Sequence, residues 1–425
     1  MIELYPGQRA RLKKRYVAER RFRGLGAAAV LAALTALAFL LGSVLWQGLP
    51  AFLEHRVRLE VTLDEAVIDP DGARDPGLLA EANYAGLLKD ALVKQLPEVS
   101  GRSEKRALAA LLSAGAAYDL QALVAADPSL IGRTVSFEAL LSDEADLLLR
   151  GEGGRDQAEG ERRLSDAQLG WMDALSKRGS VHRSFATPLL RNGDSREPEL
   201  AGVLGAAVGS FWTLAVTLAL SFPLGVAAAI YLEELAPKNR WTHLIEVNIN
   251  NLAAVPSIVY GLLGLAMFLG FFGLPRSAPL VGGMVLALMT LPTIIIAGRA
   301  AVRAVPPSIR EAALGVGASQ LQAVFHHVLP LAMPGILTGT IIGMARALGE
   351  TAPLLMIGMV AFIVDVPSGP LEPATALPVQ IYLWADSSER AFVARTSAAI
   401  LVLLAFLVLM NLTAVLLRNR FERRW

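Results

Sequence analysis

The chain has 425 residues, of which 54% are hydrophobic and 18% are charged, and it contains no cysteine, which excludes disulfides, thiolate metal sites and cysteine nucleophiles. Residues 51–200 hold 26 of the 38 acidic and 18 of the 39 basic residues, so this segment has a net charge of −8 and the remainder a net charge of +9. Such segregation predicts an acidic soluble domain joined to a membrane part with basic flanks.

The N-terminal segment predicts a first membrane span. Residues 1–23 are basic and amphipathic, and residues 24–48 carry no charge. A helix needs roughly 20 apolar residues to cross a bilayer. A cleaved signal peptide is the alternative, but its apolar core would be about 7–15 residues long and small residues would follow it. Because this stretch is longer and ends in Val44-Leu45-Trp46, we predict a retained span with a cytoplasmic N-terminus.

Residues 49–200 differ in character from the rest of the chain. They mix charged residues, glycine and helix formers, and they contain no recognisable catalytic motif. We predict that they form a large extracytoplasmic insertion between the first and second spans.

The chain is almost continuously apolar over residues 201–417. Five further spans are predicted, at 201–232, 248–274, 280–297, 335–364 and 391–417. Spans in a bilayer must be helical because no water satisfies their backbone groups. The expected fold is therefore an all-α polytopic membrane protein with six transmembrane helices, the last five forming a core over residues 201–417.

Charge and parity agree on the orientation of these spans. With a cytoplasmic N-terminus and six crossings, the basic segments 233–243, 299–333 and 418–425 fall inside, while the acidic insertion and loop 365–390 fall outside. This distribution follows the positive-inside rule. We predict a multi-pass protein with both termini in the cytoplasm.

The basic loop between the fourth and fifth spans contains EAALGVGASQLQAVFHHVLP, residues 311–330. A helix–turn–helix is expected, with its turn at Gly317, because glycine permits a tight turn. The pattern resembles the coupling loop of ABC-importer permeases, except that His327 stands where that family usually has isoleucine. The matching residues are Glu311, Ala312, Ala313, Gly317, Leu329 and Pro330. The resemblance implies docking on an ATPase; an ordinary amphipathic loop at the membrane surface is the alternative.

The sequence contains no nucleotide site of its own. A GxxxxGK[ST] loop is absent, and none of the seven lysines follows a glycine. The spans also lack a catalytic constellation or a metal-spaced cluster. We therefore expect no enzymatic activity, no metal and no bound cofactor in this chain, so that ATP and Mg²⁺ would be used by a separate ATPase subunit.

The fifth predicted span contains ARALGETAPLL, residues 345–355. Arg346 and Glu350 are four residues apart and can form an ion pair. Ionisable residues at membrane depth usually face a pathway or a partner. Thr351 adds a hydroxyl, and Pro353 can kink the helix. The alternative is a structural ion pair that locks helices together.

Three segments resemble the phosphate-specific ABC-importer permeases, A-type subunit rather than C-type. They are VPSIVYGLLG (255–264), RALGETAPLL (346–355) and LPVQIYLWA (377–385), and the resemblance covers roughly residues 200–425 and the first span. It implies a bacterial inner-membrane subunit that pairs with a C-type sister permease, an ATPase dimer and a periplasmic phosphate-binding protein. Membrane lipid surrounds such a subunit, and no nucleic acid is involved.

The resemblance also indicates a substrate pathway. Arg346 is the first candidate, because a guanidinium gives an oxyanion two parallel charge-assisted bonds. Arg299, at the inner end of the fourth span, is the second, although Arg299 and Arg303 can equally be anchors at the membrane flank. Glu350 can accept a bond from a protonated phosphate oxygen, with Thr351 beside it. Residues 377–385 predict a short interfacial helix, and a part of an outer gate under the binding protein is the alternative.

Two other functions remain open at this point. A permease for another oxyanion or for a phosphonate would use the same residues. A membrane sensor or scaffold would use the insertion as its ligand domain, but it would leave the segment 311–330 and the pair Arg346–Glu350 without a purpose.

Overall fold

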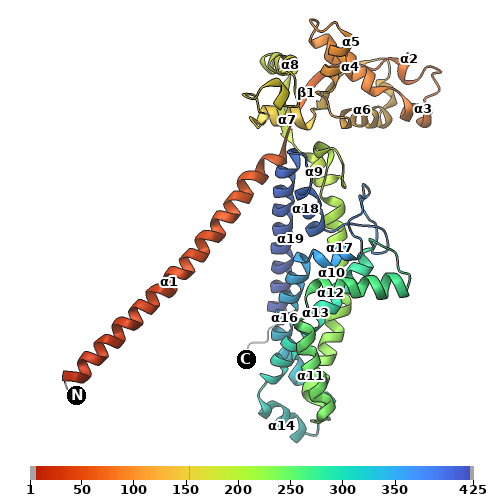
Figure 1. Ribbon diagram of the computed structural model, residues 1–425. Helices are drawn as coiled ribbons and strands as arrows, with labels where there is room; N and C mark the ends of the chain where they lie inside the picture. The colour runs from red at the N-terminus through yellow and green to blue at the C-terminus, as the bar shows by residue number, and fades with distance from the viewer. Residues whose placement is uncertain (1–5, 153, 422–425) are drawn as a thin grey trace.

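The computed structural model describes residues 6–152 and 154–421, so the expected N-terminal and C-terminal basic segments are covered only in part. Long helices form a bundle, and a domain that contains a small sheet lies at one end of it (Figure 1). In the described part of the chain, five helices are long and apolar enough to cross a membrane, or six if a bent helix pair counts as one span. The expectation of a helical polytopic protein is confirmed.

The five long helices and the bent pair follow the apolar stretches of the sequence. The long helices are α1 (Pro6–Gly48), α10 (Leu204–Ile230), α13 (Pro279–Arg303), α16 (Leu329–Gly349) and α19 (Ala391–Phe421). The bent pair is α11 (Arg240–Ala253) with α12 (Ser257–Gly264), and α12 continues as the π-helical segment η6 (Leu265–Phe271). The basic N-terminal segment is helical from Pro6 and continuous with the first apolar stretch, and no further proline interrupts the helix.

The third predicted span, 248–274, is wrong as a single straight helix. Helix α11 begins earlier, at Arg240, and the chain then turns by 100° before α12 begins. Pro256 lies in this turn, and a proline disfavours the helical conformation of the residue before it. The two halves therefore point in different directions, and the segment that begins with α12 projects to the side of the bundle (Figure 1).

The fifth predicted span, 335–364, is also corrected. Helix α16 begins at Leu329 and ends at Gly349, and a short helix, α17 (Ala352–Met356), follows after a break. Pro353 has no N–H to donate to the carbonyl of Gly349, which removes one bond of a continuous helix. Glu350 adopts an extended conformation there, with φ −80° and ψ 121°.

Close contacts between small residues set the register of the bundle. A Cβ atom on Gly339 of α16 would lie 2.2 Å from Ala297 Cβ of α13, and one on Gly335 would lie 2.6 Å from Ala301 Cβ. The residue numbers run in opposite directions, so α13 and α16 are antiparallel. Small residues allow two membrane helices to approach each other this closely.

The domain at the end of the bundle contains a three-stranded antiparallel sheet, which the all-α expectation omitted. Strand β1 (Leu53–Thr62) lies between β2 (Thr134–Leu140) and β3 (Val181–Phe185). Val57, Leu59 and Val61 alternate along β1 and are buried. This period of two is the sequence signal for a half-buried strand.

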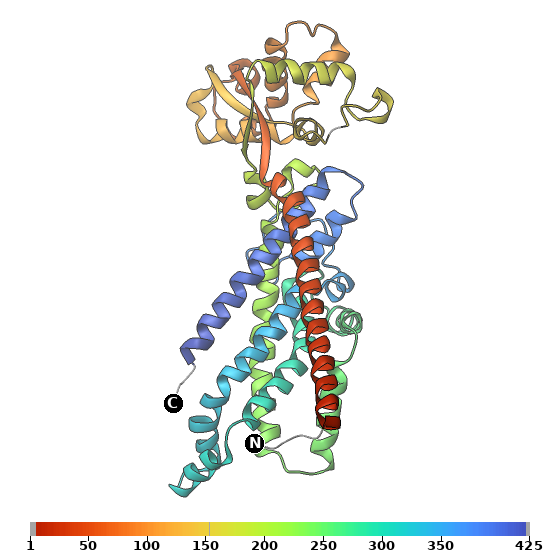
Figure 2. The same ribbon diagram turned by 90° about the vertical axis from the view of Figure 1, so that its left-hand side faces the viewer.

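Helices cover this sheet and complete the domain's core. They are α2 (Glu65–Ile68), α3 (Pro76–Glu81), α4 (Tyr84–Gln95), α5 (Arg102–Ala109), α6 (Gly115–Ala126), α7 (Asp143–Arg150) and α8 (Asp166–Lys177). Helix α9 (Thr187–Arg191) leads back to the bundle. In Figure 2 the domain lies beyond one end of the long helices, and the helical loop between α13 and α16 lies at the opposite end, toward which both described chain ends point.

The short outer helix predicted at 377–385 is present as α18 (Leu377–Ala385). Its two aromatic residues differ in environment: Tyr382 is half exposed, whereas Trp384 is buried. Trp384 Nε1 donates a hydrogen bond to Asp194 Oδ1 at 2.9 Å. Trp384 therefore anchors α18 to the chain before α10.

Candidate functional site

The segment 311–330 forms two helices joined by a tight turn. Helix α14 (Pro307–Gly315) ends just before Gly317, whose φ of +89° is a conformation that other residues rarely adopt. Helix α15 (Gln320–Ala323) then begins with a capping box: Ser319 Oγ accepts from the Gln322 amide, and Gln322 Oε1 accepts from the Ser319 amide. The chain continues through a π-helical turn, η7 (Val324–Val328), into α16.

The six residues that carry the coupling-loop resemblance divide into two groups. Glu311, Ala312 and Gly317 are exposed on α14 and the turn, where a partner could contact them. Ala313 is buried, and Leu329 and Pro330 are half-buried in the first turn of α16.

Large apolar side chains are exposed beside the first group. Val316 at the turn is 87% exposed, and Leu314, Leu321 and Phe325 are each at least half exposed. An apolar surface of this kind, at the tip of a helical hairpin, is suited to a groove on another protein.

Arg346 and Glu350 form the second part of the site. Arg346 lies in the last turn of α16, where the helix dipole favours a positive charge. Its Nε lies 3.4 Å from Glu350 Oε1, and this is the only hydrogen bond of its side chain within the described residues. The Arg346 side chain is 49% exposed and that of Glu350 is 19% exposed. Thr351 is half-buried in the break that follows.

Two of the three segments that resemble the phosphate-specific permeases meet next to this pair. Helix α12 carries one and helix α17 carries the other, and the two short helices pack against each other. A Cβ atom on Gly261 would lie 2.7 Å from Pro353 Cα, so only glycine fits at this position without a shift of the backbone. The bend before α12 and the break before α17 therefore bring these two short helices together at the C-terminal end of α16.

Arg299 lies in a different place. The register of α13 against α16 puts Arg299 opposite residue 337, nine positions from Arg346. At 1.5 Å per residue this is a separation of roughly 13 Å along the helix axis. Arg299 Nη2 donates to Glu246 Oε1 at 2.6 Å and Nε donates to Glu233 Oε2 at 3.3 Å. The two predicted pathway arginines therefore do not form one binding site.

Three carboxylates near Arg299, at the C-terminal end of α13, were not predicted from the sequence. They are Glu233, Glu234 and Glu246, and they pair with Arg299, Arg303 and Arg310. The available signal was the pair of consecutive glutamates at the end of the second apolar stretch, on the same predicted side of the membrane as Arg299, Arg303 and Arg310. The pairing itself could not be predicted, because the partners are 53 to 76 residues apart in the sequence.

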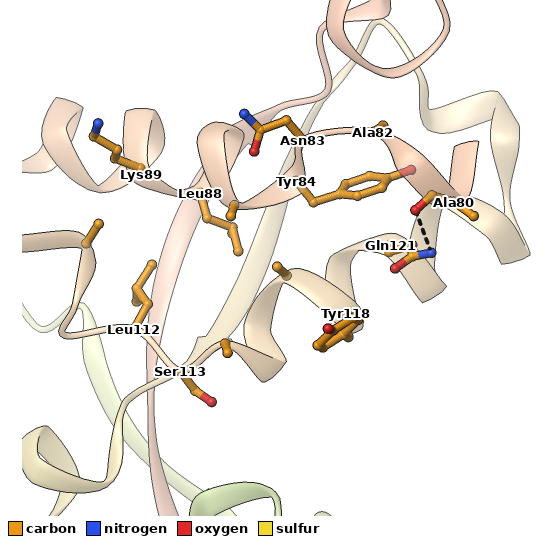
Figure 3. A pocket seen from close by; sticks show the side chains of 14 residues that line it. Ala80, Ala82, Asn83, Tyr84, Leu88, Lys89, Leu112, Ser113, Tyr118 and Gln121 are labelled. Carbon is orange, nitrogen blue, oxygen red and sulfur yellow. Dashed lines mark hydrogen bonds between the residues drawn. The ribbon is translucent and has the colours of Figure 1, made fainter. Parts of the chain in front are cut away.

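The domain that holds the sheet has a pocket of its own, between α4 and α6. Figure 3 shows this pocket, of about 500 Å³, lined by several alanines together with Tyr84, Tyr118 and Lys89. Tyr84 donates its hydroxyl to the carbonyl of Leu79, and Gln121 Nε2 donates to the carbonyl of Ala80. None of the residues singled out in the sequence lines this pocket. Among the described residues, no group of three histidine, aspartate or glutamate side chains could hold a metal ion.

Two protein families match the chain. Residues 221–425 match the family described as "Binding-protein-dependent transport system inner membrane component". Residues 9–159 match "Domain of unknown function (DUF3333)".

Individual relatives match about half of the chain or somewhat less. "Phosphate transport system permease protein PstA 1" of Mycobacterium tuberculosis is 34% identical over 225 residues, which are 52% of this chain and 72% of that protein. "Phosphate transport system permease protein PstA" of Xylella fastidiosa is 31% identical over 222 residues, covering 52% and 76%. "Phosphate transport system permease protein PstC" of Haemophilus influenzae is 30% identical over 203 residues, covering 42% and 64%.

Proposed function

Because the chain belongs to the PstA family of ABC-transporter permeases, we propose that it is the membrane subunit of an ATP-driven importer of inorganic phosphate. The observation that carries this proposal is the 34% identity that extends over 72% of a phosphate transport system permease. The chain itself is not an enzyme: in this family a partner subunit hydrolyses ATP, with Mg²⁺, and no cofactor is assigned to this chain.

We propose six membrane crossings, counting α11, α12 and η6 together as one bent span. The antiparallel pair α13 and α16 and the position of both described chain ends on one side of the bundle support this count. The basic side would be cytoplasmic, following the positive-inside rule. The sheet domain within residues 49–200 would then be periplasmic, inserted between the first crossing and the permease core of 201–417.

The coupling loop, 299–333, would dock on the ATPase through its exposed tip. Glu311, Ala312 and Gly317 present the backbone and charge of the loop, and Val316 adds an apolar anchor that is suited to a pocket. Ala313, Leu329 and Pro330 would hold the loop on the spans. Closure of the ATPase dimer then moves the loop, and the spans alternate between inward-open and outward-open states.

Partner subunits follow from the same assignment. The relatives include PstC as well as PstA proteins, so we propose a heterodimer with a sister permease of the C type. A periplasmic phosphate-binding protein would deliver the substrate to the outer side. The side chains of α1 over residues 11–40 are exposed, and they would face lipid or the sister permease.

Arg346 is proposed as the first protein contact of phosphate in the pathway. A guanidinium with one long contact can exchange Glu350 for an oxyanion, because most of its N–H groups remain available. Glu350, with Thr351 beside it, would then accept a bond from a protonated phosphate oxygen, which fully ionised sulfate cannot offer. Arg299 is proposed to act later, at the inner end of the same pathway.

The test is uptake of radiolabelled phosphate by proteoliposomes that contain the complete complex, ATP and the loaded binding protein. We expect ATP-dependent phosphate uptake that neither sulfate nor a phosphonate suppresses at equal concentration. If another anion enters instead, the permease assignment stands and the substrate is wrong. If no anion enters and no ATPase subunit co-purifies, the proposed coupling function fails.

A further inference from the structure

The inner end of α10 carries an irregular turn that places two consecutive carboxylates on two different elements. The turn is the π-helical segment η5 (Tyr231–Leu235), which follows α10 directly. A π-helical turn inserts one extra residue per turn and is often found at functional positions. Glu233 pairs with Arg299 and Arg303 of α13, whereas Glu234 pairs with Arg310 of α14.

Every side-chain nitrogen of Arg310 is engaged. Nε lies 2.9 and 3.1 Å from the two carboxylate oxygens of Glu234, and Nη2 lies 2.5 Å from Oε1. Nη1 donates to the carbonyl of Val305 at 2.6 Å, and Nη2 donates to the carbonyl of Val302 at 2.8 Å. Val302 lies in the last turn of α13, and Val305 lies two residues after its end. The guanidinium of Arg310, on α14, therefore joins this helix to the end of α10 and to the end of α13.

Helix α15 is hydrogen-bonded to the same glutamate. Gln320 Nε2, at the start of α15, donates to the backbone carbonyl of Glu234 at 2.7 Å. The side chains of Arg310 and Glu234 are 23% and 10% exposed, so water screens their interaction only weakly. Arg303, by contrast, is 67% exposed, and Glu233 retains Arg299 if Arg303 is removed.

We propose that Glu234 and Arg310 are positioning residues. They make the coupling hairpin, formed by α14 and α15, move as one body with the inner ends of α10 and α13. This inference rests on the proposed function, because it explains how motion of the loop 299–333 reaches α10, a span that the loop does not continue directly. Loss of either partner leaves the other charge poorly compensated. The hairpin would then move without the spans.

The absence of cysteine in the chain permits a direct measurement of this link. Single cysteines at Ser308 on α14 and Ala227 on α10, both exposed, would carry spin labels in the assembled complex, and pulsed EPR would report their separation. In the otherwise unaltered protein we expect one narrow distance distribution that is the same with and without ATP. In Arg310→Gln we expect a broad distribution, and Arg303→Gln serves as the matched control with a narrow one. A narrow distribution in Arg310→Gln would overturn the proposal.

Stimulation of ATP hydrolysis by the loaded binding protein provides the second readout. We expect Arg310→Gln and Glu234→Gln each to reduce this stimulation by about tenfold, a usual size for coupling between sites. The double variant should be no worse than either single variant, because both remove the same link. Additive losses would show that the two residues act separately and would contradict the proposal.

Glu234→Gln keeps the experiment decisive if Arg310→Gln does not assemble, since it leaves the two carbonyl bonds of Arg310 in place. The EPR distances require no transported substrate. Failure of the link is therefore distinguishable from failure of the proposed phosphate uptake, which is measured on the unaltered complex.

Discussion

Two arginine–glutamate pairs lie near the ends of spans, and they differ in how far the arginine is engaged. Arg310 uses all three side-chain nitrogens, on both oxygens of Glu234 and on two backbone carbonyls. Arg346 makes one contact of 3.4 Å with Glu350 and is half exposed. A guanidinium carries five N–H donors. The first pair is therefore a structural joint, whereas the second leaves donors available for a ligand.

The largest expected effect on phosphate uptake comes from substitution of Arg346, whose N–H donors are mostly unused within the described part of the chain. Arg346→Ala should lower phosphate uptake by about 30-fold or more, since loss of one partner of a close charge pair costs roughly 2 kcal/mol or more. Arg346→Lys keeps the charge but not the planar guanidinium, so its uptake rate should lie between those of the wild type and Arg346→Ala. Initial rates in proteoliposomes measure both. If Arg346→Ala takes up phosphate at the wild-type rate, Arg346 is not part of the substrate pathway.

Arg299 provides an intermediate case between the two pairs. It is held by Glu233 and Glu246, and it lies roughly 13 Å from Arg346 along α16. We expect Arg299→Gln to lower the maximal uptake rate by about threefold, the size of one net hydrogen bond, because Glu233 keeps Arg303 as a partner. The phosphate concentration at half-maximal rate should not change. A marked change in that concentration would show that Arg299 belongs to the same binding site as Arg346.

Glu350 should affect selectivity more than rate. A neutral glutamine does not repel a fully ionised oxyanion, so Glu350→Gln should weaken the preference for phosphate over sulfate by about tenfold. The measurement is the sulfate concentration that halves phosphate uptake, with one preparation of binding protein used for both proteins. Unchanged sulfate inhibition would mean that Glu350 only positions Arg346.

The smallest effect concerns Glu199, a buried carboxylate just before the start of α10. Burial raises the pKa of the Glu199 carboxyl above its ordinary value of 4.5, and Ser113 offsets this only in part. The folded state therefore holds its proton to higher pH than the unfolded state, so stability falls as pH rises from 4.5 through the raised pKa.

Glu199→Gln removes this ionisation. At pH 7 we expect the variant to melt at a higher temperature than the wild type, by about 2–4 °C for each kcal/mol that is relieved. The difference should disappear below pH 4.5, where the wild-type carboxyl is protonated in both states. An equal difference at both pH values would show that packing, and not charge, is responsible.

The sequence allowed the long spans and the coupling hairpin to be predicted, because apolar length and the position of Gly317 are local properties. It did not separate a kinked span from a broken one: Pro256 and Pro353 are each compatible with both, and packing of α12 on α17 decides the outcome. The sheet was missed although Val57, Leu59 and Val61 alternate in β1, because the helix formers of the insertion dominated the interpretation.

The candidate site was predictable only where its members are neighbours in the sequence. Arg346 and Glu350 are four residues apart, and the structure does pair them. Glu234 and Arg310 are 76 residues apart, and their contact depends on the π-helical turn at the end of α10 and on the parallel course of α10 and α13. Neither feature leaves a pattern in the composition or periodicity of the chain.

The most direct test of the contrast between the two pairs measures ATP hydrolysis and phosphate uptake in the same proteoliposomes. The two variants compared are Arg346→Ala and Arg310→Gln, each with and without the loaded binding protein. We expect Arg346→Ala to retain stimulated hydrolysis while uptake is lost, and Arg310→Gln to lose both stimulation and uptake. Loss of stimulation in Arg346→Ala, or its retention in Arg310→Gln, would contradict the division between a substrate contact and a structural joint.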